Sequence, residues 1–436
     1  GQLGRFTCEQ GSEPGLPCIN HAGKPPQKVQ FPGNATVQTV AGSEMGHYCA
    51  ILENGSVSCW GANGWGQLGY SWTDASQNNR FCTYMYAVNP VDAPDDQCNY
   101  YQGIAQPNIV EMPAGREAIA VSVGATQSCV VLDDNSVYCW GMAAQMGQHP
   151  SKYKSTTTEL VGSASTSLNL SDASNFSSEG GIATIQSQGL GSWQFYWTGK
   201  TGDTLIGFGW HNGVGPGGGA YSLPVGSEVT REFQHLPVHV PMPEGQGALA
   251  LDAGGPFTTA ILENGSLAFW GQGWGQTMGT QPTLSTELPE NRTALSFTQS
   301  GSFGCAILDG FEAWCGGQNV QGQLGNGGTD ISGTSHPLGE VDGNHEFVAI
   351  TAMNQWYSDD WGPNPSNEYG STESACAITT DAQVYCWGAN TVGQLGSYQT
   401  ASGGESDPFS SSFSPDPIHQ AGNNLAYLSE RDPDGD

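Results

Sequence analysis

The sequence predicts an all-β protein built from repeated four-stranded antiparallel sheets, and three observations support this prediction. First, 63 of the 436 residues are Gly and only 12% are charged, whereas a typical soluble protein has roughly 25% charged residues. Second, one block of sequence recurs along the chain, and internal repeats of this length indicate a repeat architecture. Third, apolar and polar residues alternate within each block with the period of two that is typical of strands.

The clearest block runs from Cys49 to Gly61 and is followed by the segment Gly66-Gln67-Leu68-Gly69. A weaker copy spans Thr198 to Gly218 and would be a sixth repeat. The other copies begin at Cys129, Ala260, Cys305 and Cys376.

Each block reads as a β-hairpin with a three-residue turn such as Glu53-Asn54-Gly55. The last turn position needs a positive φ, which Gly and Asn tolerate. Phe311 and Ala382 occupy this position in two blocks, so we expect those two turns to differ from the others.

Each hairpin is flanked by two further extended segments, which gives four strands per repeat. A short apolar run precedes the hairpin, and a Pro-led segment follows it that can bear Pro because it lies at a sheet edge. Four-stranded repeats that pack radially form a β-propeller. The apolar runs are 37–41, 118–123, 248–253 and 347–351, and the Pro-led segments are 107–110, 237–240 and 417–419.

The cysteines test this hairpin register. In four blocks two Cys lie ten residues apart, at positions that face each other on a non-hydrogen-bonded rung, where the Cα atoms approach closely enough for a disulfide. The third block has Thr259 and Phe269 at these positions and the weak copy has Thr198 and Phe208, so both Cys are missing together.

We therefore expect six disulfides, because the close Cys-x-x-Cys clusters of zinc sites are not found. Disulfides of this number indicate an oxidising compartment, so the protein is expected to be extracellular or at a cell surface. The expected pairs are Cys8–Cys18, Cys49–Cys59, Cys82–Cys98, Cys129–Cys139, Cys305–Cys315 and Cys376–Cys386.

The hairpin followed by Trp-Gly-x-Asn-x-x-Gly-Gln-Leu-Gly resembles the regulator-of-chromosome-condensation repeat. The Trp residues that match the family pattern are Trp60, Trp140, Trp270 and Trp387. The resemblance implies a seven-bladed β-propeller, here in a disulfide-bonded, secreted variant.

Six hairpins are recognised, whereas seven blades need seven. The chain starts with Gly-Gln-Leu-Gly at 1–4 and ends with a strand-like segment at 425–430, and these are complementary parts of one blade. We expect this blade to be split between the termini and to lack its hairpin in this chain. The alternatives are a six-bladed ring, or a hairpin donated by a neighbouring chain. Residues 1–430 would form the propeller, and residues 431–436 the start of an acidic linker.

The charge argues against the activities of the nuclear member of this family, which exchanges guanine nucleotide on a small GTPase and binds chromatin. Lys and Arg number 11 against 41 Asp and Glu, a net charge of −30, which cannot supply the basic footprint that nucleic acid needs. Insertion into a membrane is not expected either, because no run of 18 apolar residues occurs.

Two long connections carry aromatic and acidic side chains that suit sugar stacking or protein contacts. Both are expected on the propeller face opposite the short hairpin turns, which we call the long-loop face. The alternative is a purely structural role, in which these aromatic side chains pack against one another and form small hydrophobic cores within the loops. The candidate binding residues are Trp72, Tyr84, Tyr86, Tyr100 and Tyr101 in the first connection, and Trp356, Tyr357, Trp361 and Tyr369 in the second.

Six Asn-x-Ser/Thr sequons are candidate glycosylation sites in an oxidising compartment. Two of them lie in Asn-Gly turns, where the turn already explains the Asn. The sequon residues are Asn34, Asn54, Asn169, Asn175, Asn264 and Asn291.

No cofactor is expected, and no metal other than calcium is considered. Asp432, Asp434 and Asp436 alternate as at the start of a calcium loop, but the remaining ligands do not follow, so an acidic linker is the preferred interpretation.

Catalytic motifs such as Gly-x-Ser-x-Gly or His-Glu-x-x-His do not occur. The sequence therefore predicts a non-enzymatic interaction or structural module of a larger surface protein or appendage. It would bind protein partners, or self-assemble, through its long-loop face. A carbohydrate-binding lectin and a secreted enzyme inhibitor are the alternatives.

Overall fold

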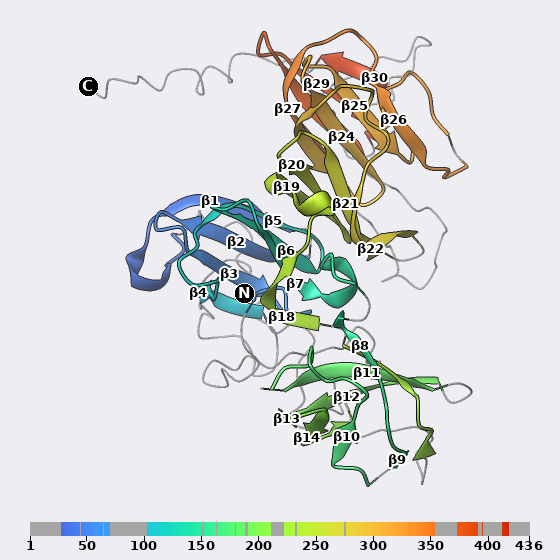
Figure 1. The fold of residues 1–436 in the computed structure, drawn as a ribbon. Coiled ribbons are helices and arrows are strands. Elements are labelled where there is room, and N and C mark those ends of the chain that lie inside the picture. Colours follow the sequence, from blue (N-terminus) through green and yellow to red (C-terminus); the bar gives the residue numbers. More distant parts are fainter. Residues whose placement is uncertain are drawn as a thin grey trace, which may run out of the picture. The chain divides into compact units, whose positions relative to one another are not determined.

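The computed structural model describes residues 28–417 except for 44, 64, 70–102, 150–151, 163, 179, 188–190, 211–221, 232, 274–275, 331, 354–372, 391–394 and 396–411. The chain divides into two compact units, residues 1–286 and residues 287–436. Strands dominate both units (Figure 1). No helix in the described residues is long and apolar enough to cross a membrane. The described residues also form three single-turn 3-10 helices: η1 (Pro32–Asn34), η3 (Ala143–Gln145) and η7 (Pro243–Gly245).

In the described residues, five four-stranded antiparallel sheets make up the repeated part of the fold, and we call them blades 1 to 5. In each blade the hairpin lies in the middle, the apolar first strand lies on one side and the Pro-bearing strand on the other. Blade 1 contains β1 (Val37–Gly42), β2 (His47–Leu52), β3 (Val57–Ala62) and β4 (Gly103–Val110). Blade 2 contains β5 (Ala118–Val123), β6 (Gln127–Leu132), β7 (Val137–Met142) and β18 (Phe233–Val240). Blade 3 contains β19 (Ala248–Gly254), β20 (Phe257–Leu262), β21 (Leu267–Gly273) and β22 (Gln276–Leu284). Blade 4 contains β23 (Ala294–Gln299), β24 (Phe303–Leu308), β25 (Ala313–Gly317) and β26 (His336–Glu340). Blade 5 contains β27 (Phe347–Met353), β28 (Ser374–Thr379), β29 (Val384–Gly388) and β30 (Ser412–Pro417).

The predicted fold class is confirmed: the protein is all-β, with the four-stranded antiparallel blades expected of a β-propeller. Blades 1 to 3 lie in the first unit and blades 4 and 5 in the second. The number of blades in the whole molecule, seven or the alternative of six, stays a prediction.

Neighbouring blades of one unit share apolar cores, which is why successive repeats stack face to face. Within the first unit, one cluster joins Ile51 and Val57 of blade 1 to Val130 and Trp140 of blade 2, and a second cluster joins blade 2 to blade 3. Within the second unit, Phe303 of blade 4 packs in one cluster with Trp387 of blade 5.

The five hairpin turns are alike, and this corrects one prediction. The third turn residue has a positive φ in every blade, and its N–H donates to the carbonyl three residues earlier at 2.8–2.9 Å. Phe311 (φ 69°) and Ala382 (φ 62°) follow this pattern, so the expectation that their turns differ is wrong. The ladder on both sides of the turn imposes the left-handed conformation whatever the residue. The third residues are Gly55, Asn135, Gly265, Phe311 and Ala382.

We expect Ala382→Gly to raise the free energy of unfolding by about 0.5–1 kcal/mol. The left-handed conformation costs an L-residue roughly 1–2 kcal/mol, and the larger backbone entropy of Gly offsets about half of this. Chemical denaturation measures the change. Asn135→Gly is the matched control: Asn tolerates this conformation, so a smaller gain is expected there, and an equal or larger gain would contradict the explanation.

Four of the six expected disulfides are present, each across a hairpin of blade 1, 2, 4 or 5. The paired Cα atoms lie 4.1 Å apart in all four, the close approach of a non-hydrogen-bonded rung. Blade 3 places Thr259 opposite Phe269 on the same rung. The pairs Cys8–Cys18 and Cys82–Cys98 lie outside the described residues. The disulfide-bonded pairs are Cys49–Cys59, Cys129–Cys139, Cys305–Cys315 and Cys376–Cys386.

A separate β-structure is inserted between the third and fourth strands of blade 2, which sequence analysis did not foresee. It comprises a five-stranded sheet (β15-β12-β11-β17-β8), a three-stranded sheet (β10-β14-β13) and a two-stranded sheet (β16-β9). Phe195, Trp197 and Leu205 belong to a core that contains only residues of this insertion. Its strands are β8 (Lys154–Thr156), β9 (Val161–Gly162), β10 (Ser167–Asn169), β11 (Gly181–Ser187), β12 (Gly191–Trp197), β13 (Gly199–Thr201), β14 (Thr204–Ile206), β15 (Gly209–Trp210), β16 (Ser222–Leu223) and β17 (Glu228–Arg231).

The interpretation of 198–218 as a sixth blade hairpin is therefore wrong. β13 and β14 do form a hairpin, but Gly199 faces Ile206 across a two-residue turn, so Thr198 and Phe208 are not opposite each other. This hairpin pairs with β10 of the insertion and not with a blade strand. Alternating apolar residues around Gly imitate the repeat because any short antiparallel hairpin shows the same pattern.

Candidate functional site

The aromatic residues predicted to bind a partner lie outside the described residues. Residues 70–102 contain the first group and residues 354–372 the second, so both groups remain predictions. Asp432, Asp434 and Asp436 also lie outside. Among the described residues no group of three or more His, Cys, Asp or Glu side chains could hold a metal ion.

The six sequon residues all lie in described positions, in two different settings. Four are exposed: Asn34, Asn54, Asn264 and Asn291. Asn169 and Asn175 are half-buried in the insertion, and the Asn169 side chain accepts a hydrogen bond from the hydroxyl of Thr204. The exposed four are the better glycan acceptors, and their occupancy remains a prediction.

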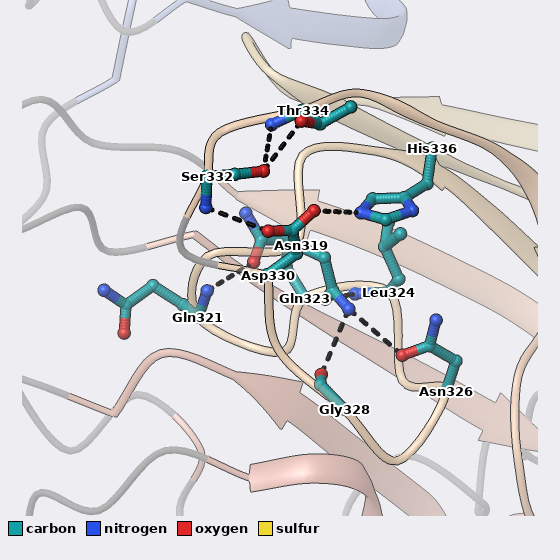
Figure 2. A network of polar contacts seen from close by, with 10 residues as sticks. All are labelled: Asn319, Gln321, Gln323, Leu324, Asn326, Gly328, Asp330, Ser332, Thr334 and His336. Atoms are coloured by element: carbon teal, nitrogen blue, oxygen red, sulfur yellow. Dashed lines mark hydrogen bonds and ion pairs between the residues drawn. The ribbon is translucent and has the colours of Figure 1, made fainter.

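The described part of the long-loop face includes the connection between β25 and β26, which together with His336, the first residue of β26, we call the 318–336 loop (Figure 2). Asn319 is the centre of this loop and is almost fully buried. Its side-chain Nδ2 donates to Asn326 Oδ1 at 3.1 Å and to the Gly328 carbonyl at 3.0 Å. Its Oδ1 accepts the N–H of Leu324 at 3.1 Å, and its carbonyl accepts the N–H of Asp330 at 2.8 Å. One buried side chain thus fixes both arms of the loop.

An Asp–His pair lies at the exposed end of this loop. His336 Nε2 and Asp330 Oδ2 are 3.0 Å apart, with about a third of each side chain exposed. Hydrogen bonds from Ser332, and then from His336, lower the pKa of Asp330, so its carboxylate is ionised at neutral pH. The pair offers a fixed negative oxygen and an imidazole edge to a ligand.

Hydroxyl groups extend the same surface. Ser332 Oγ lies 2.7 Å from Thr334 Oγ1, and the Ser332 N–H donates to Asp330 Oδ1 at 2.9 Å. Figure 2 shows His336 directed at Asp330, while the Ser332 hydroxyl is paired with Thr334. The arrangement therefore presents hydrogen-bonding groups for recognition and does not align a serine nucleophile with a histidine base.

The Gly-Gln-Leu-Gly segment clamps this loop to the next blade of the same unit. Gln323 is fully buried; its Oε1 accepts the N–H of Gln321 at 2.8 Å. Its carbonyl accepts the indole N–H of Trp387 at 2.9 Å, and its Nε2 donates to the buried carboxylate of Glu373. A Cβ on Gly325 (φ 65°) would lie 2.9 Å from Trp387 Nε1, so only Gly permits the close approach.

Blade 1 uses the same clamp on blade 2. The Gln67 carbonyl accepts the indole N–H of Trp140 at 2.8 Å and the hydroxyl of Ser128 at 2.9 Å. Asn63 Oδ1 accepts the N–H of Leu68 at 3.1 Å, as Asn319 does for Leu324. The repeat motif is thus a blade-to-blade tie: Asn shapes the turn, Gln supplies the acceptor, Gly allows contact and the next Trp supplies the donor.

The tie is broken between blades 2 and 3. Seven residues separate Trp140 from Gly147, whereas nine separate Trp60 from Gly69. Trp270 Nε1 and Thr258 Oγ1 occupy the places of the two donors to Gln67, and both are buried with no hydrogen-bond partner among the described residues. The shortened turn, which leads into the insertion, explains the missing acceptor.

These two interfaces give a matched prediction. Trp387→Phe removes an indole N–H and leaves the Gln323 carbonyl without its donor, so we expect it to cost about 1–2 kcal/mol more than Trp270→Phe. Both variants lose the same ring volume, and Trp270→Phe removes a donor that has no partner. Equilibrium denaturation measures both, and equal losses would contradict the proposed role of the clamp.

Sequence reasoning missed the 318–336 loop because it ranked connections by aromatic content. The pattern that indicates an ordered loop is Asn319, Asp330 and Ser332 spaced among glycines. Such side chains form hydrogen bonds with nearby backbone groups and so stabilise turns.

The repeated four-stranded blades and their Trp–Gln ties define the class, a repeat β-propeller protein. The family model described as "Regulator of chromosome condensation (RCC1) repeat" matches residues 369–394, which confirms the resemblance recognised in the sequence.

Solved structures of several repeat proteins are similar over most of the chain. Yeast RCC1 (Prp20), solved with Kap60 bound, is 14% identical, with 88% of this chain and 75% of that chain covered and a TM-score of 0.37. Human WBSCR16 is 12% identical, with 89% and 83% covered and a TM-score of 0.37. The CRINKLY WD40 ectodomain of the Arabidopsis thaliana receptor kinase ACR4 is 15% identical, with 82% and 81% covered and a TM-score of 0.28. Identities and TM-scores at this level do not transfer a partner or an activity.

Proposed function

We propose that the protein is an extracellular, non-enzymatic interaction module of a larger surface protein or appendage, and that it binds a protein partner through its long-loop face. The observation that carries this proposal is the 318–336 loop. It is held from within by buried Asn319 and presents the Asp330–His336 pair and two hydroxyl groups at the surface.

Rigidity favours a binding role for this loop. A loop that is already ordered loses less conformational entropy on association, so more of its contact energy appears as affinity. The clamp of Gln323 on Trp387 ties the loop to blade 5, which makes the blades a frame for a preformed surface.

The hairpin disulfides support the extracellular placement. Four disulfides are present in the described residues, and such bonds persist in oxidising compartments and are rare in the cytosol. The four exposed sequons are consistent with the same compartment.

The test places a photo-crosslinking amino acid at exposed Thr334 of the full-length secreted protein. The matched control carries it at exposed Thr201 in β13 of the insertion. We expect a protein adduct on the intact surface of the source cells from position 334 and not from 201, lost when Asp330→Ala and His336→Ala are added. Equal adducts from both positions, or an adduct that survives both substitutions, would remove the proposal. Glycan-array binding abolished by the same substitutions would favour the lectin alternative.

A further inference from the structure

Phe311 is an unfavourable residue for its turn position in two ways, and the turn itself does not require a Phe there. Its backbone has the left-handed φ of 69°, which disfavours L-residues other than Asn and Asp. Its side chain is also 42% exposed. Gly fills the same place in blades 1 and 3, so a residue without either cost is compatible with the turn. A strained, exposed aromatic residue that the fold does not need points to a role outside the fold.

Two other exposed apolar side chains lie at the same end of the second unit. Leu295 and Val348 are each 52% exposed and occupy bulges near the start of β23 and β27, where the strand register shifts. Ala294, beside Leu295, pairs with Leu308 at the base of the turn that holds Phe311. The Phe311 carbonyl accepts the N–H of Phe347, beside Val348, at 2.7 Å. The backbone thus brings the three residues to one end of the two blades.

Acidic residues lie at the same end of the two blades. Asp309 and Glu312 flank Phe311 in sequence, and both are ion-paired with Arg292. Glu346 lies just before β27, and its carbonyl accepts the N–H of Thr380 at 2.9 Å, next to Asp381 in the adjacent turn. Among the described residues named here, four carboxylates and one guanidinium therefore lie at this end, and the guanidinium pairs with only two of the carboxylates. We call the three apolar residues with these carboxylates the turn-end patch.

We propose that the turn-end patch docks a protein partner whose contacting segment is apolar and flanked by Lys or Arg. Phe311 would be the aromatic anchor, because exposed aromatic residues are the usual hot spots of interfaces. The carboxylates would select the basic flanks by charge complementarity. A second copy of this chain is a poor occupant, because each copy carries a net charge of −30 and would meet the patch with like charge.

The inference rests on the proposed role as a protein-interaction module, but it concerns the hairpin-turn end and not the 318–336 loop. The two surfaces can therefore be tested separately. Phe311→Gly removes the anchor and relieves the backbone strain, so the variant is expected to fold. Ala382→Gly relieves the same strain in the neighbouring blade and leaves the patch residues in place, which makes it the matched control.

The probe is a random-peptide phage library selected on the full-length, disulfide-intact chain. We expect the enriched peptides to combine Lys or Arg with Leu, Phe or Trp. Calorimetry with a synthetic copy of the most enriched peptide should show an affinity for Phe311→Gly that is at least about 10-fold weaker than for wild type. The affinity for Ala382→Gly should equal that for wild type. A double variant with Glu346→Gln and Asp381→Asn should weaken binding and reduce its dependence on salt.

Peptides without basic residues, no enriched peptide, or equal affinity for wild type and Phe311→Gly would overturn the proposal. Concentration-dependent self-association in sedimentation, lost in Phe311→Gly, would assign the patch to a second copy and would also overturn it. The Thr334 adduct separates the two proposals. If the adduct forms in Phe311→Gly as in wild type, and the peptide binds both proteins equally, the proposal for the turn-end patch is wrong. The proposed function as an interaction module is then unaffected.

Discussion

The His47→Gln variant is expected to resist acid better than the wild-type protein. His47 is fully buried, and burial, the largest cause, lowers its pKa from 6.5 to about 3. The folded state therefore keeps the ring neutral at pH values at which the unfolded state already binds a proton. Between pH 6.5 and about 3 this one group removes roughly 1.4 kcal/mol of stability for each pH unit lost.

The contacts of His47 explain why the neutral ring is the one that fits. The Ser128 hydroxyl donates to the Gln67 carbonyl, so its oxygen is left to accept from His47 Nε2 at 2.9 Å. His47 Nδ1 then accepts from the Ser43 hydroxyl at 2.8 Å. We assign the Nε2–H tautomer on this basis. No carboxylate is among these partners, and a hydrogen bond with the backbone of Gln127, which raises the pKa, has a smaller effect than burial.

Blade 2 supplies the substitution for this test. Gln127 occupies the place in β6 that His47 occupies in β2, and its Nε2 donates to the carbonyls of Gly255 and Phe257 in blade 3 at 3.1 Å. The position thus accepts an amide that bridges to the next blade. Denaturant unfolding at about pH 7.5 and about pH 4 measures the effect. For each pH unit below 6.5, the free energy of unfolding should fall by roughly 1.4 kcal/mol more in wild type than in His47→Gln. The carboxylates are common to both proteins and cancel in the difference. Parallel pH profiles would show that His47 is protonated in the folded state.

Exchanging the disulfide of blade 2 for the pair found in blade 3 is expected to have the second large effect. The variant carries Cys129→Thr and Cys139→Phe, which copies the Thr259–Phe269 rung. For a bridge between residues ten apart in sequence, the loss of chain constraint in the unfolded state lowers stability by about 2–3 kcal/mol. Denaturation under oxidising conditions measures the loss.

The reverse exchange gives the control. Thr259→Cys with Phe269→Cys places two thiols on a rung of the same register, so a disulfide should form and stability should rise. A strong reductant opens the disulfides of all three proteins, so the difference in unfolding free energy between each variant and wild type should become smaller. If blade 3 cannot close the new bridge, or if the blade 2 variant is as stable as wild type when oxidised, the rung is not equivalent between blades.

The blades could be predicted from the sequence because their signals are local. The period-two alternation, the turn at Gly55 and the ten-residue Cys spacing all report on one hairpin, and the hairpin register follows from them. The apolar runs 118–123 and 248–253 could be predicted as strands for the same reason, because each directly precedes a hairpin and can pair with its first arm.

The rest could not be predicted because it depends on contacts between distant segments. The insertion imitates a blade hairpin at 198–208, and its two-residue turn and the pairing of β14 with β10 distinguish the two. Phe311 breaks the residue preference of its turn because the surrounding ladder determines the backbone. The Asn319 network and the burial of His47 both arise from loop closure and blade packing, which no pattern in a single segment encodes.

Disulfide mapping of the unreduced protein tests the account most directly, because the disulfide-bonded hairpin underlies the register, the blades and the proposed compartment. Proteolysis between the blades followed by mass spectrometry should recover Cys49 with Cys59, Cys129 with Cys139, Cys305 with Cys315 and Cys376 with Cys386, each within one hairpin. Free thiols at these positions, or bridges that join cysteines of different blades, would contradict it.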